Sequence, residues 1–118
     1  MDKKTLHLVV TKRWYDMINT GGKREEYRNI SDFWLNRLIC KSEAHKIKSP
    51  CVLKPKYDWD EVMFHLGYVK EGIRFKFEGI EIKSPKKEWF PHETITTDFD
   101  QWASQNLFFT IKIGKHEE

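Results

Sequence analysis

Residues 73–82, with the sequence IRFKFEGIEI, alternate apolar and polar side chains with almost no exception. Successive side chains of a β-strand point to opposite faces, so this pattern predicts a strand with one buried face and one face in water. Residues 61–68 form a second β-rich run, and the segment VKEG between the two runs is typical of a turn. The two runs therefore predict an antiparallel hairpin within a sheet that is covered on one side.

Further strands are predicted on both sides of this hairpin, at residues 5–10, 23–30, 50–53 and 106–113. Helices are predicted at residues 12–18, 32–39 and 98–103, with Thr11 and Ser31 placed to cap the first two. The C-terminal residues 116–118 are expected to fray. This order predicts an α+β domain with a curved antiparallel sheet or small barrel, and with helices at its open end.

The chain has 118 residues, the size of a single domain that spans residues 1–118, and its 14% aromatic content argues against disorder. Its net charge of +3 is unevenly distributed. Residues 1–48 hold 11 Lys and Arg against 6 Asp and Glu, whereas residues 49–118 hold 10 against 12. The N-terminal part is therefore where an anion would bind, although an ordinary solvated surface explains the same bias.

Cys40 and Cys51 are the only cysteines, and they fit neither a zinc-type spacing nor a disulfide framework. No secretory segment follows Met1, and no run approaches the roughly 18 apolar residues that a membrane span needs. These observations predict a cytoplasmic protein with two reduced thiols. We expect no metal site, no cofactor and no membrane partner.

Residues 21–28, with the sequence GGKREEYR, place a run of charged and aromatic side chains directly after a glycine pair. If this segment is extended, Arg24, Glu26 and Arg28 share one face. The Glu26 carboxylate would then hold both guanidinium groups and leave N–H donors for a phosphate or a base edge. Lys23 can point into the same space. The alternative is a solvated strand whose charges pair with one another.

Other candidate residues are less specific. Arg13 and Trp14 offer a cation and a stacking ring, which single-stranded nucleic acid uses, but Trp14 also fits the core. Tyr68 and Trp89 flank turns, where a half-exposed aromatic ring could stack on a ligand or cover a core edge. His65 is expected to be a hydrogen-bonded residue of the sheet. No nucleophilic triad and no glycine-rich phosphate loop is present, so the residues alone predict an α+β domain with a candidate anion site.

The order of these elements resembles the ASCH domain, a branch of the PUA-like superfamily, over residues 5–114. The more specific part is N-terminal: a strand, a short helix that ends in the pattern G-x-K-x-x-E-x-R at residues 21–28, and an aromatic-rich helix with Trp34. The C-terminal half adds strands that end in Gly67-Tyr68 and in residues 79–82, then Glu88-Trp89 and the strand 107–113. Phe90 departs from the pattern, because relatives often carry Gly after this Trp.

The resemblance implies a PUA-like small β-barrel with two or three helices beside it, and a cleft that binds RNA or a nucleotide. Lys23 and Arg28 would meet phosphate or a base edge, Glu26 would accept from a base amino group or orient Arg28, and Gly22 would let the backbone approach. With the candidates above, the expected binding residues are Arg13, Trp14, Gly22, Lys23, Glu26, Arg28 and Tyr68.

Some proteins of this branch are enzymes, which leaves a catalytic alternative open. One group resembles an amidohydrolase for acetylated cytidine, with a Lys base and a Thr nucleophile three residues later. Here Glu26 occupies the Thr position, so that nucleophile is missing. For RNA cleavage, Lys23 could stabilise charge on phosphorus and Glu26 could act as general base. We therefore expect a binding module first, a ribonuclease second, and a protein-interaction module third.

Overall fold

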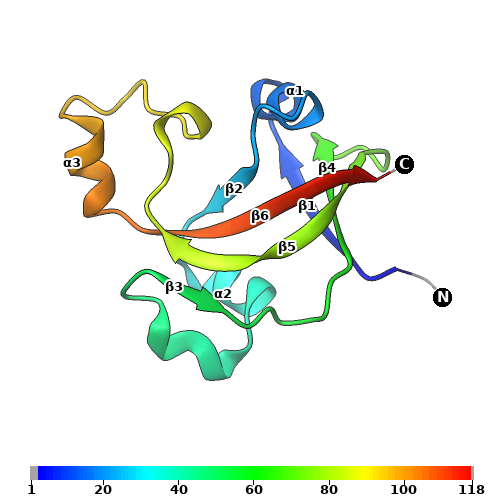
Figure 1. Ribbon diagram of the computed structural model, residues 1–118, viewed down its shortest axis with the longest axis horizontal. Helices are drawn as coiled ribbons and strands as arrows, with labels where there is room; N and C mark the ends of the chain where they lie inside the picture. Colours follow the sequence, from blue (N-terminus) through cyan, green and yellow to red (C-terminus); the bar gives the residue numbers. More distant parts are fainter. Residues whose placement is uncertain (1–2, 118) are drawn as a thin grey trace.

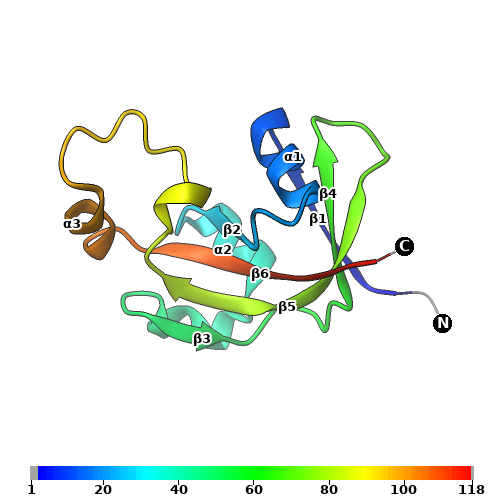
Figure 2. The same ribbon diagram turned by 45° about the horizontal axis from the view of Figure 1, so that its top comes forward.

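A computed structural model of the chain describes residues 3–117 and shows a curled sheet with helices beside it (Figures 1 and 2). The strands are β1 (Thr5–Val10), β2 (Glu25–Arg28), β3 (Cys51–Leu53), β4 (Glu61–Leu66), β5 (Ile73–Lys83) and β6 (Phe108–Glu117). The helices are α1 (Lys12–Asn19), α2 (Asp32–Leu38) and α3 (Phe99–Ser104), with the short 3-10 helices η1 (Lys41–Lys46) and η2 (Lys87–Trp89). The predicted α+β fold with a curved sheet is confirmed.

The strand order is β1-β4-β5-β6-β2, and β3 pairs with β5 off this path. The predicted hairpin of β4 and β5 is antiparallel, but β1 and β4 are parallel. The expectation of a purely antiparallel sheet is therefore wrong, and the sheet is mixed. A parallel pair needs a long crossover, and the segment with α1, β2 and α2 between β1 and β4 supplies it. The strands at the two ends of the path, β1 and β2, do not pair with each other.

Strand β5 changes its buried face near Gly79. Phe75 is buried before this point, and Ile80 and Ile82 are buried after it, which shifts the alternation by one residue. The register with β6 shifts between Phe77 and Gly79, and Gly79 has φ +125°. A bulge of this kind bends the strand and increases its twist, which helps the sheet to curl.

Strand β6 is longer than predicted. It extends to Glu117, because the first residues of the long strand β5 pair with it: Arg74 with Glu117 and Phe75 with His116. The expected fraying of residues 116 and 117 is therefore wrong, and residue 118 lies outside the described part of the chain. The β5–β6 pair is the longest in the sheet, and the shorter strand β2 pairs antiparallel with β6.

The hydrophobic core gathers side chains from β1, β3, β4, β5 and β6 and from the helices α1 and α2. Ile18 of α1 and Leu38 of α2 are fully buried in it, so both helices are anchored by the apolar faces that their spacing predicts. Ser31 caps α2 by accepting a hydrogen bond from the Trp34 amide, whereas Thr11 stands at the N-cap of α1 without a side-chain hydrogen bond. Within residues 3–117, no helix is long and apolar enough to cross a membrane.

Candidate functional site

A cleft of about 370 Å³ lies between β1 and β2, the two strands that end the sheet path. Helix α1 contributes Trp14 to its lining, η2 contributes Trp89, and the loop that follows η2 contributes Phe90 and Pro91. The residues that line it are Val9, Val10, Thr11, Trp14, Lys23, Glu26, Tyr27, Arg28, Asn29, Trp34, Trp89, Phe90, Pro91 and Phe108. Aromatic rings therefore form much of the wall, and the charged side chains come from the segment that precedes and forms β2.

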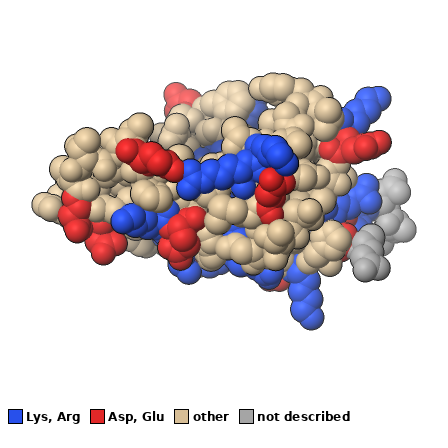
Figure 3. All heavy atoms as spheres, turned by 90° about the horizontal axis from the view of Figure 1, so that it is seen from above, with Lys and Arg blue, Asp and Glu red and all other residues tan. Residues whose placement is uncertain are grey.

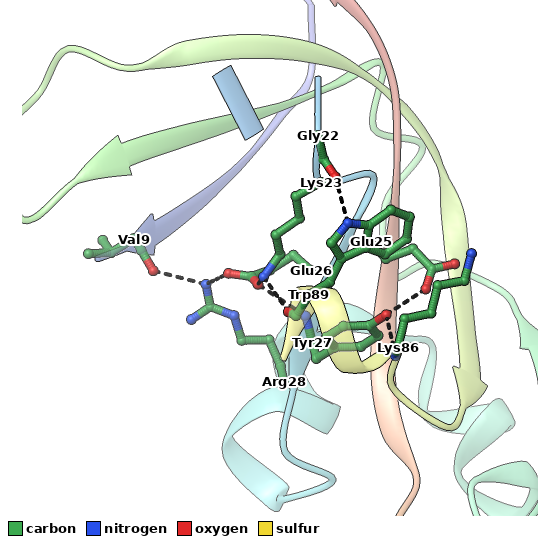
Figure 4. A network of polar contacts seen from close by, with 9 residues as sticks. All are labelled: Val9, Gly22, Lys23, Glu25, Glu26, Tyr27, Arg28, Lys86 and Trp89. Atoms are coloured by element: carbon green, nitrogen blue, oxygen red, sulfur yellow. Dashed lines mark hydrogen bonds and ion pairs between the residues drawn. The ribbon is translucent and has the colours of Figure 1, made fainter. Parts of the chain in front are cut away.

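Lys23 is the most buried of these charged residues, with 1% of its surface exposed. Its Nζ donates to Glu26 Oε1 at 3.0 Å and to the Trp89 carbonyl at 2.9 Å (Figure 4). The same Nζ lies 4.0 Å from the centroid of the Trp14 ring, which gives the ammonium a cation–π contact. Burial lowers the pKa of Lys23, and the charge of the Glu26 carboxylate opposes this shift.

Glu26 and Arg28 connect the two strand edges. Glu26 Oε2 accepts from Arg28 Nη2 at 2.9 Å, and Glu26 Oε1 also accepts from the Tyr27 amide at 3.2 Å. Arg28 Nη2 donates in addition to the Val9 carbonyl of β1 at 2.9 Å (Figure 4). The guanidinium carbon lies 4.9 Å from the centroid of the Trp34 ring. The Arg28 side chain therefore reaches from β2 to β1 and is held from several sides.

The cation that shares Glu26 with Arg28 is Lys23, not Arg24 as the alternation predicted. Arg24 is exposed and makes no hydrogen bond or ion pair with Glu26. Alternation applies only inside a strand, and β2 begins at Glu25. Arg24 therefore lies outside the regular part, and the turn before it directs Lys23 inward instead.

The opposite face of β2 fixes this strand to its surroundings. Glu25 is buried and accepts from Lys83 at 2.8 Å, Lys112 at 3.0 Å and the Tyr27 hydroxyl at 2.7 Å. Burial alone would raise the pKa of Glu25, but these hydrogen bonds lower it overall. The Tyr27 hydroxyl also accepts from the Lys86 amide at 3.0 Å, and burial raises the pKa of Tyr27 (Figure 4). These contacts hold the start of η2 against β2.

Gly22, predicted as a cleft residue, does not line the cleft, but its backbone holds a residue that does. Its carbonyl accepts a hydrogen bond from Trp89 Nε1 at 2.6 Å, and the Trp89 carbonyl in turn accepts from Lys23. Two hydrogen bonds, one to Gly22 and one from Lys23, therefore hold Trp89 against the segment before β2. The prediction placed Gly22 as a point of close backbone approach to a ligand, and here the approaching group is the indole of Trp89.

The structure brings Trp14, Lys23, Glu26 and Arg28 together in the cleft, as the sequence predicts. Arg13 does not line it: this residue forms an ion pair with Glu93, and its guanidinium carbon lies 4.4 Å from the centroid of the Trp14 ring. Tyr68 does not line it either, because it lies in the loop between β4 and β5 with 97% of its surface exposed.

Sequence reasoning missed several residues of the cleft wall. The Val9 carbonyl and Trp34 were expected only as parts of a strand and of a helix core, and no sequence signal marks a backbone carbonyl at a strand edge. Phe90 was not expected there, whereas Trp89 was a candidate stacking ring because it flanks a turn. Trp89 and Phe90 line the cleft only because their segment, more than sixty residues after Lys23 in the sequence, folds against it.

His65 forms a hydrogen-bonded pair with His7, away from the cleft. His65 Nδ1 lies 2.9 Å from the Val69 carbonyl, so this nitrogen carries the proton and donates it. His65 Nε2 is then an acceptor, and His7 Nδ1, at 2.8 Å, must donate to it. The expectation that His65 is a hydrogen-bonded residue of the sheet is confirmed.

The His7–His65 pair predicts an acid-sensitive stability. Partial desolvation of the His7 ring, which remains largely exposed, and the neighbouring His65 lower the pKa of His7 below its ordinary value of 6.5. The unfolded chain then binds this proton more readily, so stability that is present above pH 6.5 is lost as the pH falls through the folded-state pKa. Urea-unfolding midpoints at about pH 7.5 and about pH 5.5 should show a larger acid loss for the wild type than for His7→Asn.

The exposed His45 offers the matched control for this measurement, because its substitution by Asn also removes one imidazole. His45→Asn should keep the full acid loss of the wild type. If His7→Asn loses as much stability on acidification as His45→Asn does, the pair does not cause the effect.

The described residues, 3–117, contain no group of three or more His, Cys, Asp and Glu side chains that could hold a metal ion. The space-filling view from above shows basic and acidic side chains side by side, not a continuous basic face (Figure 3). The charged residues Lys23, Glu26 and Arg28 in the cleft are therefore a more specific electrostatic feature than the charge on this outer face. Comparison with family models, curated proteins and solved structures finds no match to this chain.

Proposed function

We propose that this protein binds RNA or a nucleotide, and that a base enters the cleft between β1 and β2. The observation that carries this proposal is the combination of aromatic walls with the buried row Lys23–Glu26–Arg28 in one cleft. Bases stack on aromatic side chains with about 1–3 kcal/mol each. Hydrogen-bonding groups at the floor can then recognise a base edge or a phosphate.

The size of the cleft favours one base over a longer stretch of chain. Its volume of about 370 Å³ lies near the lower end of the range of ligand pockets, about 300–1,000 Å³. A single-stranded RNA would therefore insert one unstacked base, while its neighbours stay outside. The resemblance of residues 21–28 to the ASCH pattern supports this proposal, and we also propose that the curled sheet is of the PUA-like type.

Catalysis on RNA or a modified nucleoside is the second candidate function. The observation that favours it is the lowered pKa of Lys23 beside Glu26, because a buried lysine of this kind can act as a base. Two observations place binding first. Glu26 stands where an amidohydrolase would need a Thr hydroxyl, and Lys23 is covered by Trp89, which a substrate would have to displace.

Tryptophan fluorescence tests the proposed binding, because indole rings line the cleft. Titration with a short mixed-sequence single-stranded RNA should give saturable quenching that weakens between about 50 and 200 mM salt. The RNA should remain intact on a denaturing gel. Turnover of the RNA would favour the enzyme instead, and the absence of any fluorescence change at high RNA concentration would overturn binding of the polymer.

A pair of variants locates the binding site. Trp89→Leu removes a ring of the cleft that does not belong to the hydrophobic core, and should weaken RNA binding by about 5- to 150-fold, the equivalent of one stacking contact. Tyr68→Leu removes an exposed ring outside the cleft and should leave the affinity unchanged. Equal effects of the two substitutions would show that RNA binds elsewhere.

A further inference from the structure

We infer that the ligand of the cleft is anionic at Arg28: a nucleotide whose phosphate lies against this guanidinium, not a neutral nucleoside. The inference rests on the proposed function and specifies its ligand. Its first support is the balance of charge. Lys23, Glu26 and Arg28 are the charged residues among those that line the cleft, so two cations face one carboxylate.

The contacts of Lys23 are those of a charged ammonium. Its Nζ donates to a carboxylate and to a carbonyl, and it also lies on the face of the Trp14 ring. Both cations share the single Glu26 carboxylate, so the residues that line the cleft carry one positive charge in excess. Uncompensated charge in a largely buried site is unfavourable, and an anionic ligand would relieve this cost.

The second support is the set of unused donors on Arg28. Its Nη2 donates to Glu26 and to the Val9 carbonyl. Its Nε is buried and has no hydrogen-bond partner within residues 3–117, and Nη1 makes no hydrogen bond to a described residue either. A buried donor without an acceptor is costly, and guanidinium donors fit the oxygens of phosphate particularly well. An anionic oxygen at Nη1 would balance the charge and use a donor that has no partner among the described residues.

The third support is that Arg28 is held in place before a ligand arrives. The Val9 carbonyl, the Glu26 carboxylate and the Trp34 ring fix its guanidinium on three sides. A preorganised cation binds an anion without first losing side-chain freedom. Trp14 and Trp89 line the same cleft as Arg28, so one ligand can meet both an aromatic ring and this guanidinium.

Calorimetric titration with matched ligands tests this inference. The probes are uridine and adenosine, their 5′- and 3′-monophosphates, and inorganic phosphate, all at low salt. At least one monophosphate should bind about tenfold or more tightly than its nucleoside, because it adds a charge-assisted contact. The Arg28→Gln variant should lose this preference, whereas Lys83→Gln, which removes a positive charge outside the cleft, should keep it.

A pH series on the wild type gives a second readout that does not depend on the folding of a variant. The second ionisation of a phosphate monoester has a pKa of about 6, so its charge doubles between about pH 5 and pH 7. Affinity for the preferred monophosphate should rise over this interval, while affinity for the nucleoside should not follow it.

The outcomes separate the inference from the proposed function. Equal affinities for nucleoside and monophosphate would overturn the inference and leave the proposed function standing. So would binding of the single-stranded RNA without binding of any mononucleotide. If neither the RNA nor a mononucleotide binds, the proposed function fails, and the inference fails with it.

Discussion

Replacing Glu26 by Gln should lower the free energy of unfolding by about 3–5 kcal/mol, the usual cost of removing one partner of a buried ion pair. The Glu26 carboxylate is the shared anion of Lys23 and Arg28, and both cations lie mostly out of water. Gln can still accept a hydrogen bond, but it carries no charge. For a domain of this size the melting temperature should fall by about 10–20 °C. Urea unfolding followed by circular dichroism measures the change.

The neighbouring Glu25 provides a matched control, because it is equally buried and also binds two cations. Its partners Lys83 and Lys112 keep 28% and 36% of their side-chain surface exposed, so they can return to water when the carboxylate is lost. Glu25→Gln should therefore cost only about 1–2 kcal/mol. If the two variants lose the same free energy of unfolding, the row Lys23–Glu26–Arg28 is no more sensitive to the loss of its carboxylate than the partly exposed cluster around Glu25.

A double substitution tests the cause of the Glu26→Gln effect. If the loss comes from two uncompensated cations, the further change Lys23→Met should restore part of the stability, because it removes one of them. Additive losses from the two substitutions would instead indicate that each side chain contributes through packing alone.

The strands and helices could be predicted because their signals are local. The alternation of residues 73–82 and the turn before them define the β4–β5 hairpin, and Ser31 marks the start of α2. The parallel pairing of β1 with β4 could not be predicted in this way, since it depends on how the crossover between them packs. The bulge at Gly79 likewise depends on the register with β6.

The candidate site shows the same limit. Glu26 and Arg28 share a face because they are two residues apart in a strand, and the sequence predicts this. The burial of Lys23 requires Trp89 to fold over it, and the bridge from Arg28 to Val9 requires two unpaired strand edges to face each other. Contacts between segments distant in sequence leave no periodic signal, so these parts of the site became visible only in three dimensions.

Replacing Lys23 by Met should separate stability from binding. The variant leaves Glu26 and Arg28 as a balanced pair and removes a lysine whose burial is unfavourable, as the lowered pKa of Lys23 indicates. Against this, the Trp89 carbonyl loses its donor, at a cost of about 1–3 kcal/mol. We expect these effects largely to cancel and the free energy of unfolding to change by less than about 1.5 kcal/mol.

Nucleotide or RNA binding to Lys23→Met should weaken about tenfold, or about 1.4 kcal/mol, because the cleft loses its excess positive charge. Lys83→Met is the control: it removes the same formal charge outside the cleft and should bind as the wild type does. Unchanged binding by Lys23→Met would contradict a role for this charge. Glu26→Gln is expected to lose much stability, whereas Lys23→Met is expected to lose binding and keep its stability. This result would show that the row Lys23–Glu26–Arg28 carries one cation more than the fold needs. The extra cation would then serve the ligand.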